Sequence, residues 1–392
     1  MKKETNVKGM QEAFERYVSH LPQAADACYI SNGSKTLAII GSTGLLGPHI
    51  VASLLSVHKH SDIFCLNRSL DGKQRTESTL RTLTTDFSTH SAQLHFWVTD
   101  ITQPSFGLTA LQVAFLASRV DELIFNAWDP HWSKDLVCFE TLLSGVRNTI
   151  DLCAAEYRRP RITFVSSICA VGDWPKVHHT DPAMPEAVIW DNHSAMPHGY
   201  GESKCIAEQI LAKDQEVSGV PVSIVRAEQV GGASGPSLGA WPRQGWLYAI
   251  ITASIRLKAF PMQVQPLDWI PVDTLAGGIA NVIMHPRNAS DVEVFNMLHP
   301  DAAPWSLLHK ILRTRFGLQG KEESLPDWLD RLDPTRIETA WFLERNRKRE
   351  GAQYDFQERK GSRGAASCTG HHRRFTREVA GGLDAQYRRL ER

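Results

Sequence analysis

The 392-residue chain has no excess charge of either sign, no long apolar run and no paired cysteine motif. Lys and Arg total 43, Asp and Glu total 43, and the formal net charge is zero. A neutral chain gives no electrostatic reason to bind nucleic acid or an anionic membrane surface. No uncharged apolar run reaches the ~18 residues that a membrane span needs, and residues 1–6 lead into no apolar signal core. We therefore expect no nucleic-acid partner, no membrane partner and a cytoplasmic location.

The seven cysteines are odd in number and scattered, and no two form a C-x-x-C pair. Such spacing fits reduced thiols better than a disulfide framework. The histidine groups at 58–60, 178–179 and 371–372 lack a second pair of ligands at metal spacing, so we expect no metal site. With 42% hydrophobic and 22% charged residues, the chain can build a proper core.

Short apolar runs alternate with helical patterns through the first half of the chain. Residues 48–56 and 137–154 have the periodicity of helices. Alternation of strands and helices predicts a parallel sheet covered on both faces, the doubly wound Rossmann-type α/β fold. The predicted strands are 36–40, 63–67, 94–98, 122–126, 161–167 and 221–226.

After residue 226 this alternation stops, and a Trp-rich stretch with helical patterns at 245–258 and 305–316 follows. From residue 344 the chain is rich in Arg, Lys, Gln and Gly and poor in aliphatic residues. We expect a monomer. Its four expected parts are a helical extension or linker (1–33), a Rossmann domain (34–228), a smaller C-terminal substrate-binding subdomain (229–343) and a basic, poorly ordered tail (344–392).

A glycine-rich loop with the spacing G-x-x-G-x-x-G lies between the first predicted strand and the first predicted helix. Glycines allow a tight turn and let the backbone approach a pyrophosphate, and the helix that follows offers free N–H groups. A plain turn is the alternative interpretation. The predicted dinucleotide loop consists of Gly41, Ser42, Thr43, Gly44, Leu45, Leu46 and Gly47.

The ends of the second and third predicted strands bear on the choice of cofactor. An acidic residue after the second strand favours NAD, but this chain has Arg68 there. Its guanidinium can hold a 2′-phosphate, with Arg75 assisting, so NADPH is the expected cofactor. A solvated surface arginine is the alternative. Asp100, after the third strand, can bond the adenine amine, and a turn or capping role fits it equally well.

Tyr200 and Lys204 are four residues apart in a predicted helix, which places both on one face. Tyrosine stays protonated up to about pH 10, and a nearby ammonium lowers that pKa because it favours the phenolate. Tyr200 could then donate a proton to a developing alkoxide, while Lys204 bonds the nicotinamide ribose. Ser167, at the end of the fifth strand, could donate a hydrogen bond to the same oxygen. Together these residues predict hydride transfer at a carbonyl; two surface residues of one helix are the alternative.

At these residues the chain resembles the extended short-chain dehydrogenases/reductases. Within them it is most similar to the terminal thioester reductase domains of nonribosomal peptide synthetases, fungal adenylate-forming reductases and carboxylic acid reductases. The resemblance runs from about residue 10 to about residue 315, and its last two stretches are the most specific to this subfamily. The stretches are 41–47, 65–69, 125–128, 145–148, 164–167, 199–204, 239–244 and 268–273.

The resemblance implies an NADPH-dependent reductase of secondary metabolism. An acyl thioester on the phosphopantetheine arm of a carrier protein, or on CoA, would be reduced to an aldehyde and sometimes on to an alcohol. Ser167, Tyr200 and Lys204 would form the catalytic triad, and Asn126 would join the glycine loop in the cofactor site. Ser167 replaces a frequent Thr and keeps the hydroxyl. We expect no adenylation or carrier domain in the chain, so that the thioester is met in trans.

Two other functions fit the same residues. A reductase of a free aldehyde or ketone would share the whole triad, and stretches 239–244 and 268–273 are what favour the thioester. An NADP-binding sensor without catalysis needs the glycine loop but not Tyr200 and Lys204, so this pair favours an enzyme. The tail from residue 344 differs from the helical ending of the resembled family.

Overall fold

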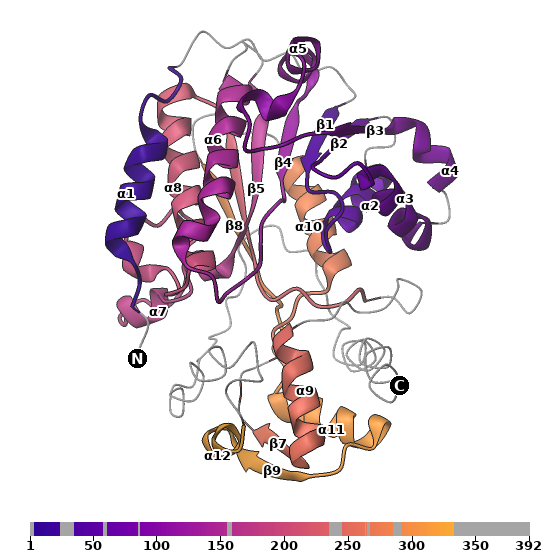
Figure 1. Cartoon of the computed structure of the whole chain (residues 1–392), viewed down its shortest axis with the longest axis vertical. Helices are drawn as coiled ribbons and strands as arrows, with labels where there is room; N and C mark the ends of the chain where they lie inside the picture. The colour runs from indigo at the N-terminus through magenta and orange to yellow at the C-terminus, as the bar shows by residue number, and fades with distance from the viewer. Residues whose placement is uncertain are drawn as a thin grey trace. The chain divides into compact units, whose positions relative to one another are not determined.

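The computed structural model describes residues 4–23, 35–57, 61–84, 87–154, 159–234, 245–262, 264, 267–284 and 292–332. The chain divides into two compact units (Figure 1). Unit 1 comprises Met1–Val230 and Val272–Leu298, and unit 2 comprises Gly231–Pro271 and His299–Arg392.

Unit 1 is built on a seven-stranded sheet in the order β3-β2-β1-β4-β5-β6-β8, with every neighbouring pair parallel. The strand order reverses between β1 and β4, and ligands of open α/β sheets bind beyond the carboxyl ends of the strands at such a point. The predicted doubly wound Rossmann-type fold is thereby confirmed. The strands are β1 (Thr36–Ile40), β2 (Asp62–Asn67), β3 (Leu94–Val98), β4 (Glu122–Phe125), β5 (Arg161–Ser167), β6 (Val222–Ala227) and β8 (Glu293–Met297).

Helices cover both faces of this sheet (Figure 1). On one face α6 (Glu140–Ala154) packs beside α8 (Gly199–Ser218), and on the other α2 (Gly47–Val57) packs beside α10 (Val272–Met284). Further helical segments of unit 1 are α1 (Val7–Val18), α3 (Gly72–Leu83), α4 (Phe87–His90), α5 (Ala110–Arg119), α7 (Trp174–Val177) and the 3₁₀ turns η1 (Ser91–Gln93), η2 (Pro104–Gly107), η3 (Leu136–Phe139), η4 (Ile168–Ala170) and η5 (Asn192–Ser194).

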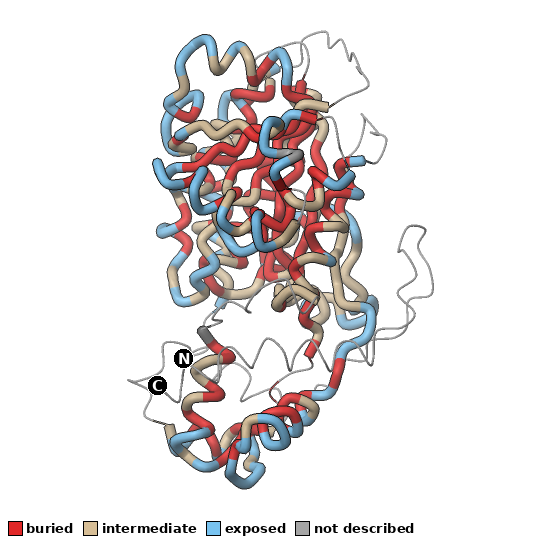
Figure 2. The backbone as a smooth tube through the Cα atoms, turned by 90° about the vertical axis from the view of Figure 1, so that its right-hand side faces the viewer, coloured by how far each residue is buried: buried red, intermediate tan, exposed pale blue. Residues whose placement is uncertain are grey.

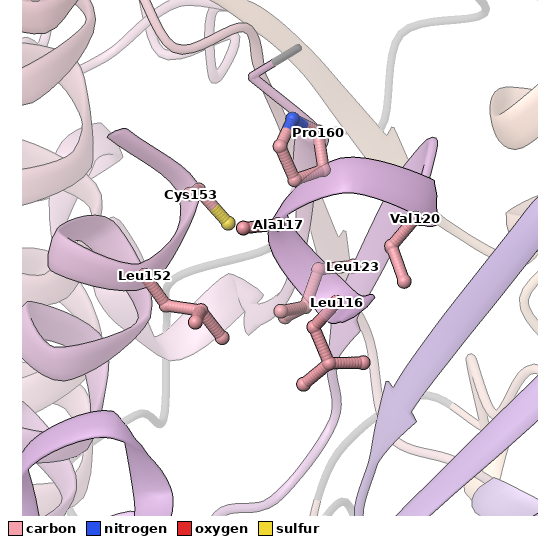
Figure 3. A pocket seen from close by; sticks show the side chains of 7 residues that line it. All are labelled: Leu116, Ala117, Val120, Leu123, Leu152, Cys153 and Pro160. Atoms are coloured by element: carbon pink, nitrogen blue, oxygen red, sulfur yellow. The ribbon is translucent and has the colours of Figure 1, made fainter. Parts of the chain in front are cut away.

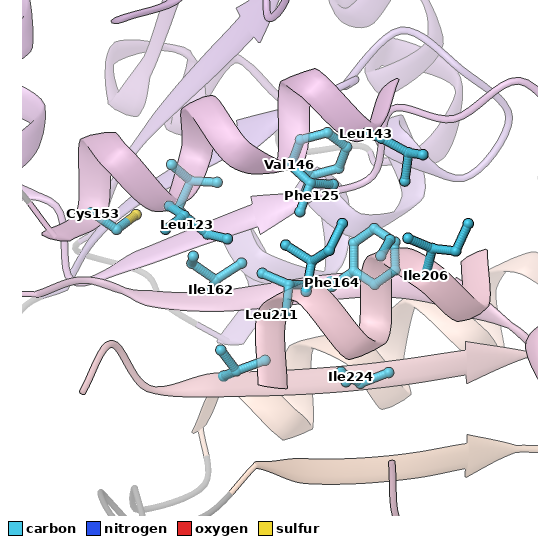
Figure 4. Close-up of a cluster of buried hydrophobic side chains, with 14 of the residues drawn as sticks. Leu123, Phe125, Leu143, Val146, Cys153, Ile162, Phe164, Ile206, Leu211 and Ile224 are labelled. Atoms are coloured by element: carbon cyan, nitrogen blue, oxygen red, sulfur yellow. The ribbon is translucent and has the colours of Figure 1, made fainter. Parts of the chain in front are cut away.

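The core of unit 1 lies between the sheet and the helices α6 and α8. Phe125 of β4 and Phe164 of β5 meet Val146 and Ile206 from these helices (Figure 4). Every residue of β4 and β5 is buried, as expected for parallel strands covered on both faces. Burying each large apolar side chain of these strands stabilises the fold by about 1.5–3 kcal/mol. Buried positions follow the strands and the inner faces of the helices (Figure 2).

The first helix belongs to unit 1 rather than to a separate extension over 1–33. Arg147 of α6 donates hydrogen bonds of 2.7–2.9 Å to three backbone carbonyl oxygens at the C-terminal end of α1. At the other end, the backbone N–H of Asn6 donates to the buried carboxylate of Glu202 on α8, at 2.9 Å. The helix is therefore attached to both α6 and α8.

The division between the larger and smaller parts also differs from the expected boundary at residues 228 and 229. Strand β8 pairs in parallel with β6, and α10 packs on α2. Residues 272–298 therefore return to unit 1, although they lie within the range expected for the substrate-binding subdomain. The tail expected over 344–392 lies outside the described residues.

In unit 2, the described helices α9 (Gly245–Leu257), α11 (Trp305–Phe316) and α12 (Leu325–Asp330) pack on a parallel pair of strands, β7 (Ala259–Met262) and β9 (Lys321–Ser324). The helices predicted at 245–258 and 305–316 are confirmed by α9 and α11. Aromatic rings form the core here. Trp246 meets Trp269 edge to face at 5.7 Å, and Trp305 stacks on Phe260 at 5.8 Å.

A small apolar crevice lies beside the amino ends of β4 and β5, and it leaves no room for a water molecule (Figure 3). Ligand sites combine an apolar lining with a few placed polar groups, and this crevice offers no polar group besides a thiol. It is a packing defect rather than a candidate site. Its lining residues are Leu116, Ala117, Val120, Leu123, Leu152, Cys153 and Pro160.

Asp214 of α8 is fully buried, and burial raises the pKa of its carboxyl to about 7. The charge of Asp151 acts in the same direction, while hydrogen bonding to Ser218 opposes it. Because this pKa lies above the ordinary value near 4, the folded protein holds a proton that the unfolded chain releases. The contribution to stability is present below about pH 4 and is lost as the pH rises through about 7.

We expect Asp214→Asn to raise the midpoint of thermal unfolding at pH 8 by about 3 °C or more, because it removes a buried charge. The gain should shrink toward pH 4, where both side chains are neutral. Circular dichroism melts from pH 4 to pH 8 measure this, with the exposed Asp181→Asn as control. A gain that is the same at every pH would contradict the assignment.

Candidate active site

The three glycines of the loop between β1 and α2 have different surroundings. Gly41 has a φ of 90°, and a Cβ there would lie 2.9 Å from the backbone nitrogen of Ala127. A Cβ on Gly47 would lie 2.3 Å from the Gly41 carbonyl oxygen, so α2 packs directly on the loop. A Cβ on Gly44 would meet nothing within 4 Å. This is the arrangement that lets a dinucleotide pyrophosphate approach the backbone at the middle glycine. The residues present therefore fit such a cofactor.

Buried side chains hold the loop from behind. Asn67, the last residue of β2, accepts from the backbone N–H of Ser42 at 3.2 Å and donates to its hydroxyl at 2.8 Å. The Ser42 hydroxyl also lies 3.0 Å from that of Thr76 on α3. Directly after β4, the amide of the partly buried Asn126 donates to the Gly41 carbonyl at 2.9 Å. The sequence analysis missed the roles of Asn67 and Thr76 in supporting the loop, since these depend on contacts between β2, α3 and the loop.

The residues predicted to choose the cofactor lie at the rim of this loop. Arg68 directly follows β2 and is exposed, and Arg75 of α3 donates to the Thr43 carbonyl at 3.4 Å. Hydrogen bonds from Thr102 lower the pKa of the Asp100 carboxyl, and the charge of Arg68 lowers it further. Asp100 thus occupies a turn, as the alternative interpretation of this residue held. It also lies within electrostatic reach of Arg68. In the loop itself, Leu45 is exposed and Leu46 buried.

The three predicted catalytic residues come together at the carboxyl end of β5. Ser167 ends the strand, and its hydroxyl accepts from the backbone N–H of Cys169 at 3.2 Å. Tyr200, in the first turn of α8, is partly buried and hydrogen-bonds to Ser167. One turn further on, the Lys204 ammonium donates to the Val165 carbonyl at 2.6 Å. It also lies 4.0 Å and 4.4 Å from the ring centroids of Trp128 and Phe164.

The expected effect of Lys204 on Tyr200 was wrong. The pKa of Tyr200 is raised, chiefly by burial and next by Cys169, with the hydrogen bond to Ser167 acting against them. Burial also lowers the pKa of Lys204 well below its ordinary value, and the Glu208 carboxylate opposes this. The ammonium is directed at a strand carbonyl rather than at the phenol. Tyr200 therefore keeps its proton at neutral pH, as a hydrogen-bond donor must.

Close backbone packing fixes the position of Tyr200. A Cβ on Gly199 would lie 2.4 Å from the backbone of Asp135, and one on Gly201 would lie 2.8 Å from the Cys169 carbonyl oxygen. His198 caps the helix, because its Nδ1 accepts from the Gly201 N–H at 3.0 Å. The ring of His198 also stacks with that of Tyr200 at 6.1 Å. The sequence analysis missed His198, because histidine is not among the residues that usually mark a helix N-cap.

Within the described residues, no three metal-ligating side chains come together, and no helix is long and apolar enough to span a membrane. The fold and the glycine loop define an NAD(P)-binding oxidoreductase of the extended short-chain dehydrogenase/reductase class. A family model described as "Male sterility protein", an NAD-binding domain, matches residues 39–279, and the chain belongs to this family.

Known proteins agree with this assignment. The chain is 32% identical over 351 residues to a carboxylic acid reductase of Neurospora crassa, covering 86% of this chain and 32% of the relative. It therefore spans about a third of that relative's length. The terminal R domain of the myxalamid PKS-NRPS pathway has a similar fold, with a TM-score of 0.70, 21% identity and coverage of 86% of this chain and 85% of that one. The PhqB reductase domain of Penicillium fellutanum also has a similar fold, with a TM-score of 0.67, 16% identity and coverage of 99% of both chains.

We expect Gly44→Ala to leave the fold intact and to weaken dinucleotide binding by about tenfold, because the methyl group would stand where the pyrophosphate approaches. Gly47→Ala is the matched variant, and it should lower the unfolding midpoint because its Cβ meets the Gly41 carbonyl. Thermal melts and titration of NADPH fluorescence separate the two effects. Unchanged NADPH binding in Gly44→Ala would rule out this loop as the cofactor cradle.

Proposed function

We propose that this chain is an NADPH-dependent reductase that converts an acyl thioester to an aldehyde. The thioester would be carried on the phosphopantetheine arm of a carrier protein or on CoA. The observation that carries the assignment as a carbonyl reductase is the meeting of Ser167 and Tyr200, two hydroxyl donors, at the carboxyl end of β5. The free thiols among the described residues support a reducing, cytoplasmic location.

The cofactor supplies a hydride for the acyl carbon. The glycine loop would hold the pyrophosphate, with Gly44 giving the backbone access to it and Asn67 keeping the loop in place. Lys204 has three N–H donors, of which one is directed at the Val165 carbonyl. The other donors are available to a ribose hydroxyl. Arg68 and Arg75, both at the rim of the loop, would bind the 2′-phosphate of NADPH.

Ser167 and Tyr200 would act on the oxygen of the substrate. As the acyl carbon gains hydride, its carbonyl oxygen becomes an oxyanion, which the two hydroxyl groups stabilise by donating hydrogen bonds. The raised pKa of Tyr200 suits this role, since the group must be protonated to donate. Collapse of the tetrahedral intermediate breaks the C–S bond, the thiolate leaves and takes up a proton, and the aldehyde is released.

The same residues would serve a free aldehyde or ketone, because hydride transfer to any carbonyl develops charge on the oxygen. The choice of a thioester is supported by the similarity of the chain to a carboxylic acid reductase and to the terminal R domain of a PKS-NRPS pathway. A substrate comparison distinguishes the two functions, and it also separates both from a protein that binds NADP without catalysis.

We expect the purified chain to oxidise NADPH when given acyl-CoA thioesters, with release of free CoA and an aldehyde. The loss of NADPH absorbance reports oxidation of the cofactor, thiol titration reports free CoA, and mass spectrometry identifies the aldehyde. The three measurements are made across a series of aliphatic and aromatic acyl groups. Tyr200→Phe should lower kcat by about 100-fold or more, because it removes a donor to the oxyanion. Oxidation of NADPH with the matching free aldehydes alone would refute the thioester assignment.

Cofactor choice has its own test. Arg68→Ala should raise KM for NADPH by about tenfold and leave KM for NADH nearly unchanged, because only NADPH carries the phosphate that the guanidinium binds. Arg119→Ala, an exposed arginine at the end of α5, is the control. If the unaltered chain uses NADH and NADPH equally well, the assignment of Arg68 fails.

A further inference from the structure

A buried carboxylate joins the elements that meet at the site. Glu208 lies on α8 one turn after Lys204, and its carboxylate is buried. It accepts a hydrogen bond of 2.5 Å from the hydroxyl of Ser166, the neighbour of Ser167 on β5. Arg226 of β6, which is aligned with Ser166 in the strand register, holds the same carboxylate with its Nε and Nη2 at 2.6–3.1 Å. One carboxylate thus connects α8 to the ends of β5 and β6.

The arginine extends this network to the long segment between β5 and α8. The Nη1 of Arg226 donates to the Pro185 carbonyl at 3.1 Å, and its Nη2 donates to the Ala187 carbonyl at 2.9 Å. The segment is also attached to β8, where the amide of Asn296 donates to the Met184 carbonyl at 3.1 Å. Residues 184–187 are therefore held against the sheet by partly buried hydrogen bonds.

Glu208 also bears on the charge of Lys204. The groups that face this ammonium are the Val165 carbonyl of β5, the rings of Trp128 and Phe164, and the thiol of Cys169 in η4. Burial lowers the pKa of Lys204, Glu208 gives the largest opposing effect, and Cys169 adds to it. Arg226, beyond Glu208, carries the positive charge that pairs with this carboxylate.

We propose that Glu208 is a positioning residue that holds Lys204 and the Ser167 end of β5 in the geometry required for reduction. The inference rests on the roles proposed above for Lys204 and Ser167. Glu208 does not touch the reacting atoms. It acts through α8, through Ser166 and through the charge state of Lys204.

A second carboxylate of the same chain provides a matched control. Glu122, the first residue of β4, is buried and accepts from Thr163 of β5 at 2.5 Å. Arg161 donates its Nε to Glu122 and its Nη2 to the Val282 and Ile283 carbonyls. Each of the two glutamates therefore pairs with one hydroxyl and one arginine that binds two carbonyls. Glu122 lies at the amino end of its strand, away from Lys204.

The experiment compares Glu208→Gln with Glu122→Gln in the full chain. Both remove the buried carboxylate that the arginine Nε binds, and both should lower the unfolding midpoint. Arg161 keeps a second carboxylate, Glu293, at 3.6 Å from its Nη1, so the loss of stability should be the smaller one in Glu122→Gln. In Glu208→Gln the ammonium of Lys204 loses its stabilising anion, so it loses its proton at a lower pH. The alkaline limb of the kcat profile with NADPH and an acyl-CoA should therefore move down by about 1 pH unit. Glu122→Gln should leave that limb in place.

If Glu208→Gln does not fold, the double variant Glu208→Gln with Arg226→Met removes both charges of the pair. Its alkaline limb should move down in the same way. The matched control is the double variant Glu122→Gln with Arg161→Met. Should the unaltered chain reduce no thioester, the proposed function fails. The pH dependence of NADP⁺ binding then tests Glu208 alone, with affinity expected to fall at a lower pH in the Glu208 variant. The inference would be overturned if the alkaline limb of the kcat profile, or the pH profile of NADP⁺ binding, moved equally in the Glu208 and Glu122 variants. It would also be overturned if the profile moved in neither variant.

Discussion

The packing of the first turn of α8 against the carboxyl end of β5 is the contact on which the site depends. Gly201 allows it, because a side chain there would collide with the Cys169 carbonyl just after β5, and Gly199 lets the same turn pack on the backbone of Asp135. The contact brings the hydroxyl groups of Tyr200 and Ser167 together and directs Lys204 at the strand. Burial then sets the chemistry, since it keeps the phenol protonated and lowers the pKa of Lys204, an effect that the Glu208 carboxylate opposes.

The same principle holds at the cofactor loop, where position is again secured by polar groups behind the residues that would touch the ligand. Ser42 is held by Asn67 and Thr76, and Gly41 by Asn126. The buried pairs Glu208–Arg226 and Glu122–Arg161 join neighbouring elements at opposite ends of the strands. A buried ion pair is weak support for stability, because desolvation offsets attraction. Fixed geometry is the more direct consequence of these pairs.

The sequence predicted the fold class, the glycine loop and the meeting of Ser167 with Tyr200. Each of these follows from local spacing or from strand ends that share one edge of the sheet. It did not predict the return of β8 to the sheet beside β6 or the attachment of α1 by Arg147, since both depend on contacts between distant segments. The predicted shift in the pKa of Tyr200 was wrong in direction for a related reason. Spacing along a helix does not report burial, and burial dominates here.

The central claim is that hydride passes from NADPH to the acyl carbon of a thioester at this site. The most direct measurement uses NADPH carrying deuterium at both C4 positions, a single acyl-CoA, and mass spectrometry of the trapped aldehyde. The account predicts one deuterium on the aldehyde carbon, and a strongly reduced yield in Tyr200→Phe with cofactor binding retained. Cofactor binding without any labelled aldehyde from a thioester would contradict it.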